Sequence, residues 1–267
     1  MEVIICSDPD EVGRVAAAKM ARVCADAGPH AVLGVATGSS PLATYAQLAA
    51  LVASGALDLS EASAFALDEY VGLPPGHPQC YANVIDATVT RPLRMDPARV
   101  HVPDGGAADL EAAAEQYEAM IAAAGGVDVQ LLGVGSNGHV GFNEPTSSLA
   151  SRTRIKTLAH RTRADNARFF SSPDEVPRHC LTQGLGTIMD ARNVVLVAQG
   201  ARKAGAVAAL VEGPVTALVP ASVLQLHRRA TVVVDEDAAG RLTLTEYYRW
   251  TYAHKPDWQR FDVPRAR

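Results

Sequence analysis

The sequence lacks several features that mark specialised classes of protein. No apolar run reaches the ~18 residues that would span a bilayer, and the N-terminus does not combine a basic segment with a long apolar one, so we expect neither a membrane helix nor a signal peptide. Only four cysteines occur in 267 residues, and none forms a CxxC pair, which argues against a zinc site and a disulfide framework. Lys and Arg (24) do not outnumber Asp and Glu (29), so there is no general basic field for nucleic acid or anionic lipid. These absences indicate a soluble cytoplasmic protein, most consistent with an enzyme that acts on small molecules.

Short apolar runs alternate with segments of helical period. The runs at 3–6, 31–35, 62–67, 127–134, 194–198 and 231–234 predict strands, and helices are expected after residue 8, after 41, at 109–124 and at 201–212. Alternation of Leu with Thr at 242–245 predicts a late edge strand. The alternation predicts an α/β fold with an open, mostly parallel, Rossmann-like sheet and helices on both faces. Because no linker or composition break divides the chain, we expect one domain over 1–267, with a polar tail at about 255–267.

Polar residues follow three of the predicted strands. These clusters lie at 37–40, 68–69 and 135–144. In open parallel sheets, ligands bind outside the carboxyl ends of the strands. We therefore expect the three clusters to meet at one edge of the sheet.

The first cluster consists of Thr37, Gly38, Ser39 and Ser40, at a predicted helix start. Free backbone N–H groups and the positive end of a helix suit a phosphate group. An ordinary helix N-cap is the alternative, and the loop taken alone favours it. Neither a Walker A loop nor a dinucleotide-binding glycine pattern is present.

The second cluster is Asp68-Glu69, at the end of an apolar run. One of these carboxylates could simply cap the next turn. A partly desolvated carboxylate at this edge could instead be a general base with a raised pKa.

The third cluster is a glycine-rich stretch that carries His139 between Asn137 and Glu144. Either neighbour could fix the tautomer of the imidazole. A histidine with two such neighbours, in a loop at the ligand-binding edge, favours a catalytic role over a structural one.

Cations gather in an otherwise acidic chain. Arg168 and Lys203 lie at expected helix starts, where either could reach a phosphate group or remain a surface charge. Residues 145–164 hold a basic block that predicts either an anion site or a solvated face. The basic block consists of Arg152, Arg154, Lys156, Arg161 and Arg163.

In this order, the motifs resemble those of the glucosamine-6-phosphate deaminases, also called glucosamine-6-phosphate isomerases, over nearly the whole chain. The resemblance rests on the segments 37–41, 67–73, 137–145, 147–157 and 224–227. It implies conversion of D-glucosamine 6-phosphate and water to D-fructose 6-phosphate and ammonia, without an organic cofactor or a metal. It also implies that His139 opens the sugar ring, that Glu144 orients the imidazole, and that Asp68 moves a proton from C2 to C1.

The resemblance assigns further residues to binding. It places the substrate phosphate on Thr37 to Ser40, with Arg168 and Lys203 closing over it, and makes 163–170 a lid. Some members carry Asp where this chain has Asn137, and other branches carry Asn. We expect Asn137 to hold the ring of His139 by a hydrogen bond without offsetting its charge.

A regulatory site is a further implication of the resemblance. Some members of the family are hexamers activated by N-acetylglucosamine 6-phosphate, which binds between subunits. The matching residues are present in this chain, although a C-terminal aromatic partner, Tyr247 or Tyr248, aligns only with a shift of register. These matching residues are Ser147, Arg154, Lys156 and Thr157.

Two other functions remain open at this stage. A 6-phosphogluconolactonase would share the phosphate loop and a histidine but would need no base at C2. A catalytically silent sugar-phosphate sensor would need none of the proton chemistry of Asp68, His139 and Glu144. Galactosamine 6-phosphate is an alternative substrate for the deaminase.

Overall fold

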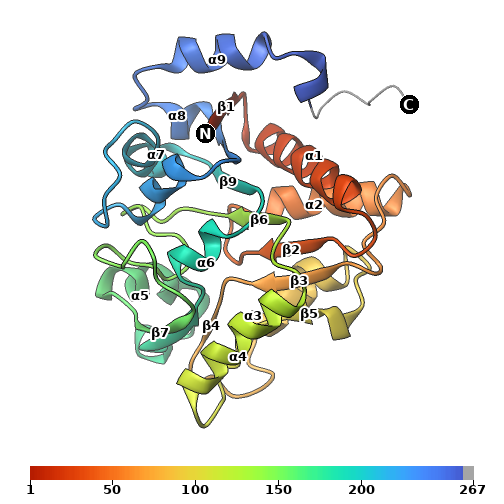
Figure 1. The fold of residues 1–267 in the computed structure, drawn as a ribbon. Helices are drawn as coiled ribbons and strands as arrows, with labels where there is room; N and C mark the ends of the chain where they lie inside the picture. Colours follow the sequence, from red (N-terminus) through yellow and green to blue (C-terminus); the bar gives the residue numbers. More distant parts are fainter. Residues whose placement is uncertain (261–267) are drawn as a thin grey trace.

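A sheet of seven parallel strands forms the centre of the protein in the computed structural model (Figure 1). The structure describes residues 1–260, apart from the side chains of Arg161 and Trp258, so 261–267 of the predicted tail lie outside it. The order β1-β10-β9-β6-β2-β3-β5 confirms the predicted parallel α/β fold. The strands are β1 (Glu2–Cys6), β2 (Val32–Val35), β3 (Ser63–Ala66), β5 (Val100–His101), β6 (Val129–Leu132), β9 (Val194–Ala198) and β10 (Ala230–Asp235).

Helices cover both faces of this sheet, and each face has its own apolar core. Side chains of a strand alternate between the faces, so Leu33 packs in the core of α1 and α2 while its neighbour Val32 packs on the other side. Tyr117 and Leu185 belong to that second core. The helices of the first face are α1 (Pro9–Ala27) and α2 (Leu42–Ala53), and those of the second are α4 (Leu110–Ala123), α6 (Leu185–Met189) and α7 (Ala204–Val211).

Several helix starts follow from their capping residues. The Asp8 side chain accepts a hydrogen bond from the Glu11 amide and Pro9 occupies the first turn, which confirms the predicted start of α1. Asp109 caps α4 in the same way. Among residues 1–260, no helix is both long and apolar enough to cross a membrane.

A second, antiparallel sheet of three strands was not predicted. Its order is β4-β8-β7, formed by β4 (Asp68–Tyr70), β8 (His179–Thr182) and β7 (Arg154–Thr157). The chain leaves the main sheet at the end of β3 and enters the small sheet at Asp68, opposite Thr182. In Figure 1, β7 lies beside α5 (His160–Asn166), to one side of the main sheet. The small sheet thus carries Asp68 at the edge where ligands are expected.

The predicted edge strand at 242–245 is wrong. This segment leads into α9 (Thr245–Ala253), after the short helix α8 (Glu236–Ala239). The Glu212 carboxylate, just after α7, accepts hydrogen bonds from the Thr243 amide and hydroxyl and from the Leu244 amide. These bonds hold the backbone at the start of α9 instead of at a sheet edge.

Candidate active site

The three predicted clusters lie at the carboxyl ends of neighbouring strands. Asp68 follows β3, residues 37–40 follow β2, and the glycine-rich loop follows β6, and these strands are adjacent in the main sheet. Two contacts join the next strand, β9, to this edge. Gln199 donates to the Ser40 carbonyl at 3.1 Å, and the Lys203 ammonium donates to the Val134 carbonyl at 2.7 Å.

Asp68 is a buried carboxyl group with a strongly perturbed pKa. Its exposed fraction is 5%, and no described group donates a hydrogen bond to its carboxylate. Burial, reinforced by the charge of Glu69, raises the pKa of Asp68 to about 8. A carboxylate of this kind is basic enough to accept a proton from carbon near neutral pH.

Glu69, the next residue, has the capping role that the sequence left open. Its carboxylate accepts hydrogen bonds from the amides of Tyr81 and Ala82, each at 2.9 Å, at the start of α3 (Tyr81–Ile85), and from its neighbour Tyr70 in β4 at 2.7 Å. Burial raises the pKa of Glu69, and these N–H groups oppose the shift. The two adjacent carboxylates therefore divide into a structural cap, Glu69, and a candidate base, Asp68.

His139 and Glu144 face one another in the loop after β6. The distance from His139 Nδ1 to Glu144 Oε2 is 3.6 Å, which is an ion-pair contact and longer than a hydrogen bond. Burial by itself would raise the pKa of Glu144, but His139 and the Thr162 and Asn137 hydrogen bonds outweigh it and lower the pKa to about 2. Glu144 is thus ionised beside the imidazole and can support a positive charge on it.

Asn137 does not hold the imidazole ring, which corrects our expectation. Its Nδ2 donates to Glu144 Oε2 at 2.8 Å, and its Oδ1 accepts the backbone N–H of His139 at 3.2 Å. The amide donor of Asn satisfies one lone pair of Glu144 without adding a charge. Asn137 therefore positions the carboxylate partner of His139.

Two glycines allow the loop to approach its neighbours closely. A Cβ atom at Gly135 would overlap three atoms of the His139 ring. A Cβ atom at Gly141, where φ is +56°, would lie 2.9 Å from Thr182 Oγ1 and 3.4 Å from Asp68 Oδ2. The loop that carries His139 therefore passes directly beside the Asp68 carboxylate, and both candidate catalytic groups belong to one site.

The loop at 37–40 leaves the start of α2 without a side-chain cap. The N-cap position is Pro41, and no side chain accepts a hydrogen bond from the first turn in the described part of the chain. The N-cap alternative is therefore wrong. Gly38, with φ at +94°, makes the turn. Uncapped N–H groups at the start of a 12-residue helix suit an anion.

The two predicted phosphate-binding cations lie within electrostatic range of each other. Burial lowers the pKa of Lys203, Asp165 opposes the shift, and Arg168 adds to it. Lys203 ends the 3-10 helix Ala201–Lys203, which leads into α7, as predicted. Arg168 lies in the 3-10 helix Ala167–Phe169, which follows α5 and leads into no further helix, so Arg168 lies at the end of a helical segment and not at the start that we predicted. Its guanidinium lies 4.6 Å from the centre of the Phe169 ring.

Comparisons with known proteins show the family to which the chain belongs. The family model described as glucosamine-6-phosphate isomerases/6-phosphogluconolactonase matches residues 7–233. The chain is 61% identical to a glucosamine-6-phosphate deaminase of Cutibacterium acnes, over 96% of this chain and 98% of that one. It is 57% identical to the Streptomyces coelicolor protein of the same name, over 97% and 99%. The chain belongs to the glucosamine-6-phosphate deaminase family.

Solved structures support the same assignment. A monomeric glucosamine-6-phosphate deaminase is 40% identical and matches with a TM-score of 0.87, over 90% of this chain and 100% of that one. A 6-phosphogluconolactonase from Trypanosoma cruzi matches over 91% and 97%, with a TM-score of 0.69 and 21% identity. At that identity the second match shows a shared fold and no more.

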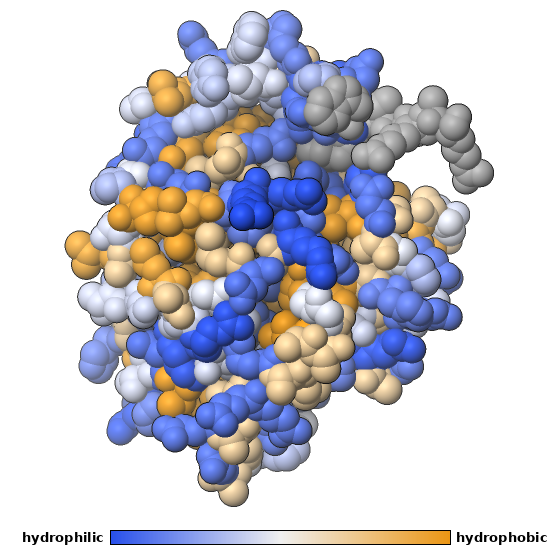
Figure 2. All heavy atoms as spheres, viewed as in Figure 1, coloured by the Kyte–Doolittle hydropathy of each residue, from blue (hydrophilic) through white to orange (hydrophobic). Residues whose placement is uncertain are grey.

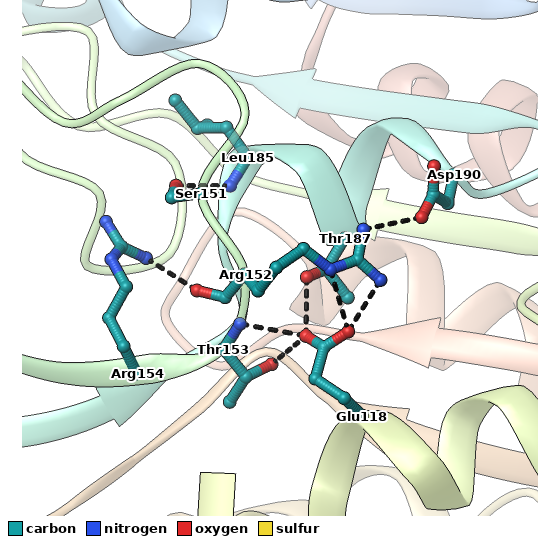
Figure 3. Close-up of polar contacts among 8 residues, drawn as sticks. All are labelled: Glu118, Ser151, Arg152, Thr153, Arg154, Leu185, Thr187 and Asp190. Carbon is teal, nitrogen blue, oxygen red and sulfur yellow. Dashed lines mark hydrogen bonds and ion pairs between the residues drawn. The ribbon is translucent and has the colours of Figure 1, made fainter. Parts of the chain in front are cut away.

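Within this deaminase-family chain, the basic block does not form one anion site. Figure 3 shows the Arg152 guanidinium between Glu118 and Asp190, at 2.6 Å from each. Arg163 donates to the carbonyls of Val176 and Pro173, and the side chain of Arg161 is outside the described part of the structure. Two of the cations thus have structural partners.

Three of the four residues matched to the activator site lie in β7, and they do not all lie on one face of it. The side chains of Arg154 and Lys156 lie on one face of the strand, and that of Thr157 lies on the opposite face. In the described structure, Ser147 Oγ and Arg154 Nη2 are buried and have no hydrogen-bond partner. Ser147 and Arg154 therefore keep hydrogen-bonding capacity that a ligand could use.

A surface hollow of about 510 Å³ lies away from the candidate site. It is lined by 189–192 and 226–229, which precede β9 and β10 and so lie at the opposite edge of the sheet. Figure 2 shows hydrophilic residues gathered over the middle of the face that it draws. The hollow adds nothing to the catalytic groups.

Sequence reasoning missed two threonines at the site. Thr162, from α5, donates to Glu144, and Thr182, from β8, accepts from the Phe142 amide at 3.1 Å. Only their long-range contacts distinguish them, so no local signal in the sequence would have found them.

Proposed function

We propose that the protein deaminates D-glucosamine 6-phosphate to D-fructose 6-phosphate and ammonia. The observation that carries the proposal is the desolvated Asp68 carboxylate beside the loop of His139 and Glu144. The site thus combines a base that can move a proton between carbon atoms, Asp68, with a group that can move a proton between the sugar oxygens, His139. An aldose–ketose isomerisation of a cyclic sugar requires both. The curated relatives that carry this name support the same substrate.

Ring opening is the first step of the proposed mechanism. His139 takes the proton of the anomeric hydroxyl as the C1–O5 bond breaks, and returns a proton to the ring oxygen. The imidazole is transiently positive, and ionised Glu144 stabilises it at 3.6 Å. The product is the open-chain aldehyde.

Proton transfer from C2 to C1 is the second step. Asp68 removes the C2 proton, which the neighbouring carbonyl and ammonium groups make acidic, the ammonium gives up a proton to the aldehyde oxygen O1, and an enolamine forms. Asp68 then delivers the proton to C1, leaving a protonated imine at C2. Water adds to that imine, ammonia leaves, and the C2 ketone of fructose 6-phosphate remains. The raised pKa of Asp68, about 8, suits both halves of this transfer.

The substrate phosphate is proposed to lie on Thr37 to Ser40 at the start of α2. The uncapped amides there supply donors, and Lys203 and Arg168 supply positive charge. Residues 163–170 act as a lid that keeps water from the enolamine.

We further propose that N-acetylglucosamine 6-phosphate binds as an activator at Ser147, Arg154 and Lys156. The unpartnered buried atoms of Ser147 and Arg154 support this site. The test is ammonia release at low substrate with and without the N-acetyl compound, and an unchanged rate would refute activation. The hypothesis of a homo-hexamer is tested separately by light scattering, because a relative of 40% identity is described as monomeric.

The proposed reaction is tested by measuring ammonia and fructose 6-phosphate together. Equal release of both from glucosamine 6-phosphate supports the deaminase. A parallel reaction with galactosamine 6-phosphate shows which configuration of the C4 hydroxyl the protein prefers in its substrate. No ammonia, but hydrolysis of 6-phosphogluconolactone, would favour a lactonase instead. Binding of glucosamine 6-phosphate without any product would favour a sensor.

A further inference from the structure

Thr162 connects α5 to the proposed catalytic dyad. Its hydroxyl, buried in the fold, donates a hydrogen bond to Glu144 Oε1. Glu144 Oε2 accepts from Asn137 at 2.8 Å and lies 3.6 Å from His139 Nδ1. The ring nitrogen is itself buried and makes no hydrogen bond to any described group. The direction of the Glu144 carboxylate is thus set by Thr162 and Asn137, and the imidazole depends on that direction for its partner.

The rest of α5 is attached to two other parts of the site. Asn166 donates to the hydroxyl of Tyr70 at 2.8 Å, and Tyr70 lies two residues after Asp68 in β4. The Phe170 ring packs edge-on against Tyr70, with 5.8 Å between ring centres. Asp165, near the end of α5, and Arg168, two residues after it, both act electrostatically on Lys203. One short helix therefore makes hydrogen bonds to the dyad and to the strand of the candidate base, and its last turn acts electrostatically on Lys203.

We infer that Thr162 is a positioning residue, which makes ring opening by His139 and Glu144 depend on the placement of α5. The inference rests on the proposed deaminase function. A substrate phosphate that engages Lys203 and Arg168 fixes the C-terminal end of α5. The helix then holds Thr162 against Glu144, and the carboxylate supports the imidazole. Proton transfer by Asp68 depends on α5 less directly, because no described group of α5 makes a hydrogen bond or an ion pair with the Asp68 carboxylate, and the bond from Asn166 reaches only the Tyr70 hydroxyl in the same strand.

The test compares Thr162→Val with Thr162→Ser. The valine variant keeps the shape of the side chain and removes the hydroxyl, whereas the serine variant keeps the hydroxyl. We expect kcat of Thr162→Val to fall about tenfold with KM within about twofold, and Thr162→Ser to restore kcat. Ring opening then limits turnover in the valine variant. The isotope effect on kcat with substrate deuterated at C2 should therefore fall towards one, or stay at one if it already has that value.

A matched control uses a similar bond away from the site. Thr187 is buried and donates to the Glu118 carboxylate at 2.6 Å, as Figure 3 shows. Thr187→Val loses the same type of hydrogen bond, so a similar loss of thermal stability is expected with kcat and the isotope effect unchanged. Because Thr162→Val could fail to fold, Asn166→Ala is a second test, since it loosens α5 without touching Glu144. It should lower kcat, and its isotope effect should fall towards one or stay at one, as in Thr162→Val.

Three results would overturn the inference. The first is a kcat of Thr162→Val within twofold of the wild-type value, and the second is a Thr162→Ser variant as slow as the valine variant. The third is a Thr162→Val variant whose kcat is lower but whose isotope effect stays above one and equals that of the wild type. If Thr162→Val does not fold, full activity of Asn166→Ala overturns it. Absence of ammonia release by the wild-type protein is a different failure, because it refutes the proposed function itself.

Discussion

Substitution of Asp68 by Asn exchanges a buried carboxyl group for a neutral amide of nearly the same shape. In the proposed mechanism the carboxylate is the base at C2, so the variant should bind the substrate and release no ammonia. The same burial that makes Asp68 basic also makes its charged form costly to the fold. We therefore expect the inactive variant to be more stable than the wild type at neutral pH.

The size of this effect follows from the pKa of Asp68, which burial raises from 3.8 to about 8. Between these two values the folded protein holds the proton and the unfolded chain does not. The free energy of unfolding must then fall as pH rises, by ~1.4 kcal/mol per pH unit. From pH 4 to pH 7 the free energy of unfolding of the wild type falls by about 4 kcal/mol for this reason, whereas that of Asp68→Asn does not. Above pH 8 the difference should stop growing.

The assay is urea unfolding of both proteins at pH 5, 6, 7 and 8. The stability advantage of Asp68→Asn should widen steadily across this range. Glu69→Gln is the control, and it should change stability in the opposite direction. It places an amide NH2 group, which cannot accept a hydrogen bond, beside the backbone N–H groups at the start of α3, so the free energy of unfolding should fall by ~1–3 kcal/mol. A difference that does not vary with pH, or an Asp68→Asn variant less stable than the wild type at pH 7, would refute the reasoning.

Three other substitutions test separate parts of the site. Gly135→Ala places a methyl group in the space of the His139 ring and should lower kcat about 100-fold, measured by ammonia release; unchanged kcat would contradict the packing. Lys203→Met removes a charge that we propose binds the substrate phosphate and should raise KM about tenfold with a smaller change in kcat. Glu118→Gln weakens the contacts with Arg152, Thr153 and Thr187 and should cost about 1–3 kcal/mol in urea unfolding, with kcat near the wild-type value.

The main sheet was predictable because its strands are buried on both faces. Continuous β-branched runs such as 194–198 and 230–235 have few other stable environments, and the capping residues Asp8 and Asp109 mark where helices begin. The small sheet was not predictable, because its strands are three or four residues long and carry charged side chains. Its pairing depends on partners more than 20 residues away. The segment at 242–245 alternates like a strand, but Glu212 holds it at a helix start.

The place of the candidate site, at the carboxyl ends of three strands, was predictable from the sequence. Polar residues directly after β2, β3 and β6 had to meet at one edge, and they do. The division of roles between Asp68 and Glu69 was not visible, because it depends on amides at 81 and 82. The same is true of Thr162, whose contact with Glu144 joins segments 18 residues apart.

The most direct test of Asp68 as the C2 base follows the hydrogen that it moves. Glucosamine 6-phosphate deuterated at C2 is converted in ordinary water, and the fructose 6-phosphate is analysed by NMR for deuterium at C1. Wild-type protein should carry part of the deuterium from C2 to C1 while releasing one ammonia per ketose, and Asp68→Asn should form no product. Turnover by Asp68→Asn at a near-native rate would contradict the account.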